Sequence, residues 1–326
     1  MIAALVITVA SLTPSQPCAS CHAVQHDRWQ TSRHADSLGS PLYVGMREWA
    51  RADAGEEVAG RCTTCHSVAN PTGGGRTDAV VCEACHQAAD APTGPASLAI
   101  DRALAVAGVR MVDAPHTLVA DASLPSGGRC LVCHAELKNP AGVAVCTTGP
   151  EVAARAGGPG CVTCHMPDTS HAFAGAAPEL LARAAQLVVD RRGAEAVVSV
   201  INRGAGHALP TGSALRAVRL EVEFRDPSGA RLGDNRDDLA STFARVLADA
   251  EGNAPVPPWR AVAVARDSRL VPGERRAFTY PLPPGTAAVT ARLIYRRAPT
   301  PILDRLGIAA EGPFAPIEMA RFELAW

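Results

Sequence analysis

The stretch Cys82-Glu-Ala-Cys85-His86 sets the character of the first half of the chain, because its pattern occurs five times. Each copy has two residues between its cysteines and a histidine directly after the second cysteine. The ten cysteines are Cys18, Cys21, Cys62, Cys65, Cys82, Cys85, Cys130, Cys133, Cys161 and Cys164. The histidines that follow them are His22, His66, His86, His134 and His165.

This pattern is the attachment signature of c-type haem. Two thiols one helical turn apart form thioethers with the two vinyl groups, and the next residue brings an imidazole to the iron. The chain has 10 histidines in 326 residues, so five such placements by chance have odds of about 3 in 10⁸. We therefore predict five covalently bound haem c groups, with the five histidines as proximal iron ligands.

Other uses of paired cysteines explain less of the pattern. Disulfides would leave the five histidines without a role, and a thioredoxin-like redox pair accounts for one motif at most. Cys62, Cys65, Cys82 and Cys85 fit a zinc-ribbon spacing, but zinc does not require the histidines. Cys146, the eleventh cysteine, is expected to be a buried, inert thiol; a second ligand or an intermolecular role is the alternative.

Five histidines lie outside the motifs, one for each of the five predicted haem irons. Four of them are predicted to be distal ligands: His34, His116, His171 and His207. The fifth, His26, lies four residues after His22, so on a helix both face the same side and cannot bind opposite faces of one haem. Met46 and Met111 are more often core residues than ligands. If neither His26 nor a methionine is a ligand, one iron keeps an open position.

The distribution of residues predicts two domains built differently. All cysteines precede residue 165, whereas ten of the 13 aromatic residues lie at or after Phe173, so haem is expected to fill the core of residues 18–175. Short helices are expected around 23–35, 43–52 and 96–107. Residues 176–326 are expected to form a β-sandwich, with alternating strands at 186–190, 195–201, 218–224, 278–282, 289–295 and 320–324. The predicted fold class is thus two-domain α + β, with little regular structure in the first domain.

Charge and targeting signals restrict the setting of the protein. The 31 basic and 32 acidic residues give no basic excess for nucleic acid, and no apolar run is long enough to span a membrane. Residues 1–17 resemble the apolar part of a signal peptide without its preceding basic residues. Haem is attached outside the bacterial cytoplasmic membrane, so we expect an exported protein, periplasmic or at the cell surface. Ten propionates against five ferric cores lower its formal charge to about −6.

Several further elements resemble the cytochrome c554 family of multihaem cytochromes. They are Trp29-x-x-Ser32-x-His34, Val81-Cys82-Glu-Ala-Cys85-His86 and Cys161-x-x-Cys-His165-Met-Pro167, and Gly206-His207-x-Leu-Pro-Thr-Gly212 resembles the tail of some members. The resemblance implies closely stacked, mainly bis-histidine haems that pass electrons, with one five-coordinate haem in some members. Catalytic members use a crosslinking tyrosine or an active-site lysine. Tyr280, Tyr295 and Lys138 offer no clear counterpart, so no catalytic residue is predicted.

Two functions remain to be weighed. Bis-histidine irons are coordinatively saturated and change oxidation state without binding substrate, which favours an electron relay between other redox proteins. The β-domain would dock such a relay into a larger respiratory or extracellular assembly. The alternative is an oxidoreductase whose open haem acts on a small nitrogen or sulfur compound.

Overall fold

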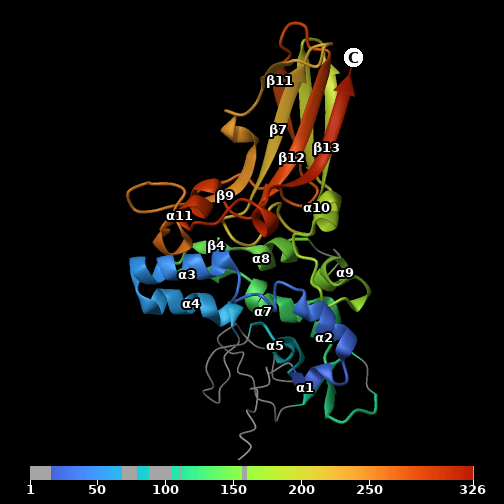
Figure 1. Cartoon of the computed structure of the whole chain (residues 1–326), viewed down its shortest axis with the longest axis vertical. Coiled ribbons are helices and arrows are strands. Elements are labelled where there is room, and N and C mark those ends of the chain that lie inside the picture. The colour runs from blue at the N-terminus through green and yellow to red at the C-terminus, as the bar shows by residue number, and fades with distance from the viewer. Residues whose placement is uncertain (1–15, 68–78, 88–104, 110–111, 156–159, 326) are drawn as a thin grey trace, which may run out of the picture. The chain divides into compact units, whose positions relative to one another are not determined.

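The chain folds into two compact units in the computed structural model, which describes residues 16–67, 79–87, 105–109, 112–155 and 160–325. The first unit comprises Met1–Cys133 and Gly160–Ala174, and the second comprises His134–Pro159 and Gly175–Trp326. Residues 134–159 lie inside the range 18–175 that the cysteine motifs suggested for one domain, yet they fold with the later strands. Figure 1 labels several elements of each unit.

The first unit consists mainly of short helices. They are α1 (Gln16–Ala19), α2 (Ala23–Gln30), α3 (Pro41–Ala54), α4 (Glu56–His66), α5 (Cys82–His86), α6 (Ser123–Ser126), η2 (Gly128–Cys130), α7 (Leu131–His134, whose last residue begins the second unit), α9 (Cys161–His165) and η3 (Pro167–Thr169). Two three-residue strands, β1 (Val106–Gly108) and β2 (Leu118–Ala120), pair in parallel. The predicted low content of regular structure agrees with this arrangement.

Helices α3 and α4 form the longest regular element of this unit, a pair joined at Gly55. Pro41 occupies the first turn of α3, where its missing N–H costs nothing, and Gly55, at φ +88°, takes the positive-φ conformation that ends the helix. Ala50 and Ala59 are fully buried. Such small side chains let two helix backbones come close together without large side chains between them.

A single tryptophan links segments that are distant in sequence. Trp29, on α2, donates its indole N–H to the carbonyl oxygen of Val80 at 2.8 Å. It also packs against buried Val81 and Ala84. The first and third cysteine motifs are therefore held together by a hydrogen bond and by apolar contact.

The second unit contains two stacked antiparallel sheets. One has the order β10-β9-β7-β12-β13, with β8 also paired to β7, and the other has the order β11-β6-β5. In Figure 1, β7, β12 and β13 run side by side. The bounds are β5 (Ala185–Arg192), β6 (Glu195–Asn202), β7 (Ala217–Arg225), β8 (Arg231–Asp234), β9 (Thr242–Ala248), β10 (Ala263–Asp267), β11 (Arg275–Pro281), β12 (Ala288–Arg296) and β13 (Ile317–Ala325).

The core of this unit lies between the two sheets. Along β7 the side chains alternate between partly exposed and buried, and Leu220 pairs with Leu293 of β12. Val198 and Val200 of β6 face the same cluster from the other sheet. Because alternate residues of a strand point to opposite faces, this period-2 pattern specifies which face enters the sandwich.

Residues 134–155 pack on one end of the sandwich. They contribute β3 (Leu137–Lys138), β4 (Ala144–Cys146) and α8 (Thr148–Ala153). Val143 and Val145 are buried against Leu247 and Ala261. The Asn139 side chain donates to the carbonyl oxygens of Pro258 and Ala261 at 2.8 and 2.7 Å. These contacts explain why the segment folds with the strands rather than with the motifs that flank it.

Helical segments complete the second unit: α10 (Pro178–Ala184), η4 (Leu239–Ser241), η5 (Pro258–Arg260), α11 (Thr300–Arg305) and η6 (Gly312–Phe314). The two-domain α + β class is confirmed, and all six predicted strands are present. Strands β8, β9 and β10 were not predicted. Of the helix expected around 96–107, only residues 105–107 are described, and residues 106 and 107 belong to β1. None of the described helices is long and apolar enough to cross a membrane.

Candidate haem sites

Each cysteine pair lies on or beside one turn of helix. Two motifs coincide with short helices, α5 and α9, and a third forms the last turn of α4. The fourth runs through η2 into α7, and in the first the N–H of His22 donates to the carbonyl oxygen of Cys18 at 2.8 Å. Since residues three and four apart share a helix face, the two thiols of each pair point to one side together with the histidine.

Thiols from different motifs approach one another within the first unit. The Cys65 and Cys133 thiols lie within hydrogen-bonding distance of each other, and so do the Cys130 and Cys161 thiols. Gly127 stands against the last motif: a Cβ there would lie 2.9 Å from the Cβ of Cys161. The second, fourth and fifth motifs are therefore close together. All eleven cysteines are described, and none forms a disulfide.

Two motif histidines face a second histidine from another part of the chain. The ring centroids of His22 and His116 are 6.4 Å apart, and those of His86 and His171 are 6.1 Å apart. The planes of the second pair differ by 21°. The sequence predicted His116 and His171 as distal ligands without assigning their partners.

This spacing fits two imidazoles on one iron. Metal–imidazole bonds are about 2 Å long, and with the ring radii of about 1 Å each they put the two centroids about 6 Å apart. Direct stacking would bring the rings closer, as in the 4.5 Å contact of Tyr43 with His66. The two pairs therefore leave room for a metal ion between them, and a haem iron fits the residues present.

Hydrogen bonds fix which ring nitrogen of several histidines can bind metal. The Nδ1 atoms of His66, His86, His171 and His207 lie 2.9–3.2 Å from the backbone carbonyl oxygens of Ser37, Ala107, Thr169 and Ala208. A carbonyl oxygen only accepts, so Nδ1 carries the proton and Nε2 keeps its lone pair. Ligating histidines in metalloproteins commonly donate their other ring N–H in this way.

Burial disfavours the charged form of four histidine rings. It lowers the pKa of His34, His66, His171 and His207 below the ordinary histidine value. The neighbouring His66 lowers the pKa of His34 further. A neutral imidazole is the form that binds metal; the ligand roles of these four side chains remain predictions.

The remaining histidines have other surroundings. His34 meets Phe173 edge-on, with ring centroids 4.4 Å apart. His26 is buried on α2, one turn from His22, and lies against Trp29 with centroids 5.5 Å apart. His134 and His165 end α7 and α9. Met46 lies partly buried on α3, and Met111 is outside the described residues.

His66 is surrounded differently from His22 and His86. Its ring is stacked on that of Tyr43, with centroids 4.5 Å apart and planes 24° apart. Ser37 forms two hydrogen bonds with this histidine. Its carbonyl oxygen accepts from Nδ1 of His66, and its hydroxyl donates to the His66 carbonyl oxygen at 2.6 Å. The hydrogen bond at Nδ1 therefore orients the His66 ring.

Metal-only sites are not formed by the side chains that the structure describes. No group of three or more His, Cys, Asp or Glu among these residues is arranged to hold a metal ion. Cys62, Cys65, Cys82 and Cys85, which fit a zinc-ribbon spacing, do not converge as such a group. Cys146 is partly buried in β4, with its sulfur 3.6 Å from the Thr148 hydroxyl.

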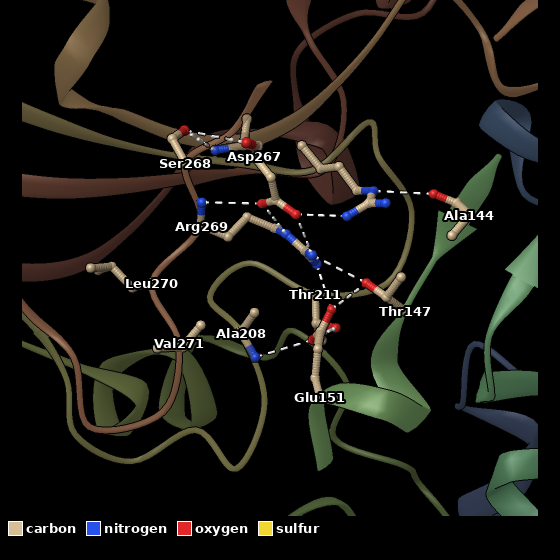
Figure 2. Close-up of polar contacts among 12 residues, drawn as sticks. Ala144, Thr147, Glu151, Ala208, Thr211, Asp267, Ser268, Arg269, Leu270 and Val271 are labelled. Atoms are coloured by element: carbon tan, nitrogen blue, oxygen red, sulfur yellow. Dashed lines mark hydrogen bonds and ion pairs between the residues drawn. The ribbon is translucent and has the colours of Figure 1, made fainter. Parts of the chain in front are cut away.

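His207 belongs to the second unit and is surrounded by residues that sequence reasoning missed. Glu151 and Arg269 form an ion pair at 2.6 Å whose side chains are 11% and 8% exposed. Figure 2 shows Glu151 also meeting Ala208, directly after His207, and Thr211, four residues after it. Neither charged residue belongs to a motif. Of the residues in these contacts, only those of the Gly206–Gly212 segment had a sequence signal; Ala208 and Thr211 of that segment are the partners of Glu151.

Five Cys-x-x-Cys-His turns, together with imidazoles paired at the spacing of two ligands on one metal ion, are typical of multihaem c-type cytochromes. The chain is a protein of this class. The family described as cytochrome c554 and c-prime matches residues 17–87, which hold the first three motifs. The chain is similar in structure to a penta-heme cytochrome c552 from Thermochromatium tepidum, with a TM-score of 0.80 and 26% identity over 96% of this chain and 99% of that one. No curated protein matches the sequence.

Proposed function

We propose that this chain is an exported electron relay that carries electrons between redox partners through closely packed, mainly bis-histidine haems. It holds five covalently bound haem c groups, attached through its five cysteine motifs. The observation that carries the proposal is the pair of facing imidazole couples, His22 with His116 and His86 with His171, at 6.4 and 6.1 Å. An iron with two histidine ligands exchanges electrons without opening a site for substrate.

The neighbouring thiols support close packing of the cofactors. Cys65 lies beside Cys133, and Cys130 lies beside Cys161. Because each cysteine pair is bonded to the edge of its own porphyrin, motifs that touch bring porphyrin edges together. Short spacing between cofactors is what a relay requires. In this proposal His34 and His207 complete the distal ligand set, and the β-unit docks the relay into a respiratory or extracellular assembly.

Intact mass and the ferric spectrum of the purified holoprotein test this function together. We expect a mass increment of five haems, a mainly low-spin ferric spectrum, and full reoxidation of the reduced protein by an acceptor cytochrome. Fractionation of the expressing bacteria should place the protein outside the cytoplasmic membrane. A spectrum dominated by high-spin haem, or a haem count other than five, would contradict the proposal.

The surroundings of His66 favour a second candidate, an oxidoreductase with one open haem. The His66 ring is stacked on the ring of Tyr43 at 4.5 Å, in a closer contact than the histidine pairs at 6.1 and 6.4 Å. An iron bound by His66 alone would keep one position for a small nitrogen or sulfur compound. Cyanide that shifts one fifth of the ferric haem signal, combined with steady turnover of hydroxylamine or nitrite, would favour this candidate. Cyanide binding without turnover would leave the relay as the better account.

A further inference from the structure

The peptide group between His207 and Ala208 is held at both of its polar atoms. The His207 carbonyl oxygen accepts from the Asn202 side chain at 2.9 Å, and the Ala208 N–H donates to Oε2 of Glu151 at 3.1 Å. The ring is tied to the same segment, because Nδ1 of His207 donates to the Ala208 carbonyl oxygen at 2.9 Å. The backbone and the imidazole of His207 therefore share one rigid frame.

Glu151 reaches this loop from a separate element, α8. Its Oε2 also accepts from the Thr211 hydroxyl at 2.5 Å, so one carboxylate oxygen holds the loop both directly after His207 and four residues on. Thr148, on the same helix, meets the Thr211 hydroxyl at 2.9 Å. Helix α8 packs closely against Ala135 at Gly149, where an added Cβ would lie only 2.8 Å from the Cα of Ala135.

A second charged layer fixes the other carboxylate oxygen of Glu151. Oε1 accepts from Arg269 at 2.6 Å and from the Thr147 hydroxyl at 2.5 Å. Arg269 in turn binds both oxygens of Asp267 at 2.8 Å, and Asp267 also accepts from Arg245 at 2.6 Å. The two carboxylate oxygens of Glu151 thus accept four hydrogen bonds, in the cluster that Figure 2 shows. A buried carboxylate satisfied in this way has one orientation.

The arrangement exceeds what loop stability requires. The loop is already attached to the segment between β10 and β11 by reciprocal backbone hydrogen bonds between Leu209 and Leu270, at 2.8 and 3.1 Å. Placing a charged side chain in a buried position costs free energy unless every partner is supplied. What the Glu151 contact adds is control of the peptide plane next to His207. Because Nδ1 of His207 is bonded to the Ala208 carbonyl oxygen, holding this peptide also restrains the direction in which Nε2 points.

We propose that Glu151 is a positioning residue that aims the imidazole of His207 at a haem iron. The inference rests on the proposed role of His207 as a distal ligand. Because ligand atoms must be held to within a fraction of an ångström for a strong metal bond, loosening the His207–Ala208 peptide should weaken the iron–Nε2 bond before it unfolds the loop. Folded holoprotein with a labile sixth ligand is the expected result.

Four variants of the holoprotein test this role: His207→Ala, Glu151→Ala, Glu151→Gln and Glu221→Ala. Glutamine retains an oxygen that can accept from Ala208 and Thr211, so it should preserve ligation although it removes the ion pair. Glu221→Ala is the matched control, because it removes an ion pair with Arg292 of 2.9 Å between β7 and β12. The measurements are the high-spin fraction of the ferric spectrum and the rate at which cyanide binds.

We expect His207→Ala to convert one haem of five to the high-spin form, and Glu151→Ala to accelerate cyanide binding at that haem about tenfold. Glu151→Gln and Glu221→Ala should keep the wild-type rate. If Glu151→Ala does not fold, Thr211→Val, which removes one hydrogen bond with little change in volume, should give a smaller acceleration in the same direction.

Two results would overturn the inference, and they are distinguishable. A low-spin spectrum in His207→Ala would show that His207 is not a ligand, which removes that part of the proposed function as well. A high-spin haem in His207→Ala, together with wild-type cyanide rates in Glu151→Ala or Thr211→Val, would overturn the positioning role alone. Equal acceleration in Glu221→Ala would assign the effect to general destabilisation and would also overturn it.

Discussion

The imidazole of His86 faces that of His171, with ring centroids 6.1 Å apart and planes 21° apart. Each ring is anchored by its Nδ1 to a backbone carbonyl oxygen, that of Ala107 for His86 and that of Thr169 for His171. Both Nε2 atoms are therefore available to one iron. His86 lies in the third motif, on α5, whereas His171 lies outside the motifs, in the segment after α9. An iron held by both would tie together distant parts of the first unit.

Removal of the distal member of this pair should open a single haem. In His171→Ala we expect one fifth of the ferric haem to become high-spin and to bind cyanide, while the haem content stays at five, because the cysteines retain the group. His26→Ala is the control: His26 lies against Trp29 on its own helix, and the spectrum should not change. An unaltered spectrum in His171→Ala would exclude the pairing.

The indole of Trp29 should stabilise the contact between the first and third motifs. Trp29→Phe keeps most of the apolar contact with Val81 and Ala84 but leaves the Val80 carbonyl oxygen without its 2.8 Å partner. We expect the free energy of unfolding, followed through the haem absorbance, to fall by about 1–2 kcal/mol.

The control for this change is Thr31→Val, which removes an exposed hydrogen bond of 2.8 Å to the Arg28 carbonyl oxygen. Water replaces that partner, so a change within about 0.5 kcal/mol is expected. Equal losses in Trp29→Phe and Thr31→Val would argue against a special role for the indole N–H.

Gly127 should be needed both for its backbone conformation and for the space beside Cys161. Its φ is +82°, and an added Cβ would lie 2.9 Å from the Cys161 Cβ. Gly142 has a φ of +80° with nothing within 4 Å, so Gly142→Ala measures the conformational cost alone, about 1–2 kcal/mol. Gly127→Ala should cost more and should reduce haem incorporation at the fifth motif. Similar stability and full haem content in both variants would refute the steric argument.

Asp121 should make the first unit more stable at neutral pH than in acid. Hydrogen bonding from Ser123, followed by the Arg129 guanidinium 2.7 Å away, holds the pKa of Asp121 below its ordinary value of 3.8. The unfolded chain therefore binds a proton more readily than the folded protein. The stabilising contribution is complete above pH 3.8 and is lost as the pH falls through the lower, folded pKa.

Thermal unfolding between pH 2 and 7 tests this dependence. Asp121→Asn should lower the Tm at pH 7, and its curve should converge with that of the wild type in acid. Asp36→Asn, at an exposed pair 3.5 Å from Arg33, is the matched control and should have a smaller effect at every pH. Parallel curves for the wild type and Asp121→Asn would contradict the assignment.

The alternation of residues was sufficient to predict the main strands of the sandwich. In β7 every second residue from Val218 to Phe224 is buried, because a half-buried strand needs only a local period of two. Strand β10 shows the limit of the method: all five of its residues, Ala263–Asp267, are exposed. Its pairing with β9 at the sheet edge comes from backbone hydrogen bonds, which leave no pattern in the side chains.

The sequence by itself determined the cofactor class and its number, since thioether attachment and proximal ligation need only five consecutive residues. It also supplied the distal candidates, but not their partners. Only the tertiary structure brought His116 to His22 and His171 to His86, and only it placed Glu151 and Arg269 beside the loop of His207. Covalent attachment is encoded by spacing along the chain, whereas axial pairing and the buried contacts that aim a ligand depend on distances through space.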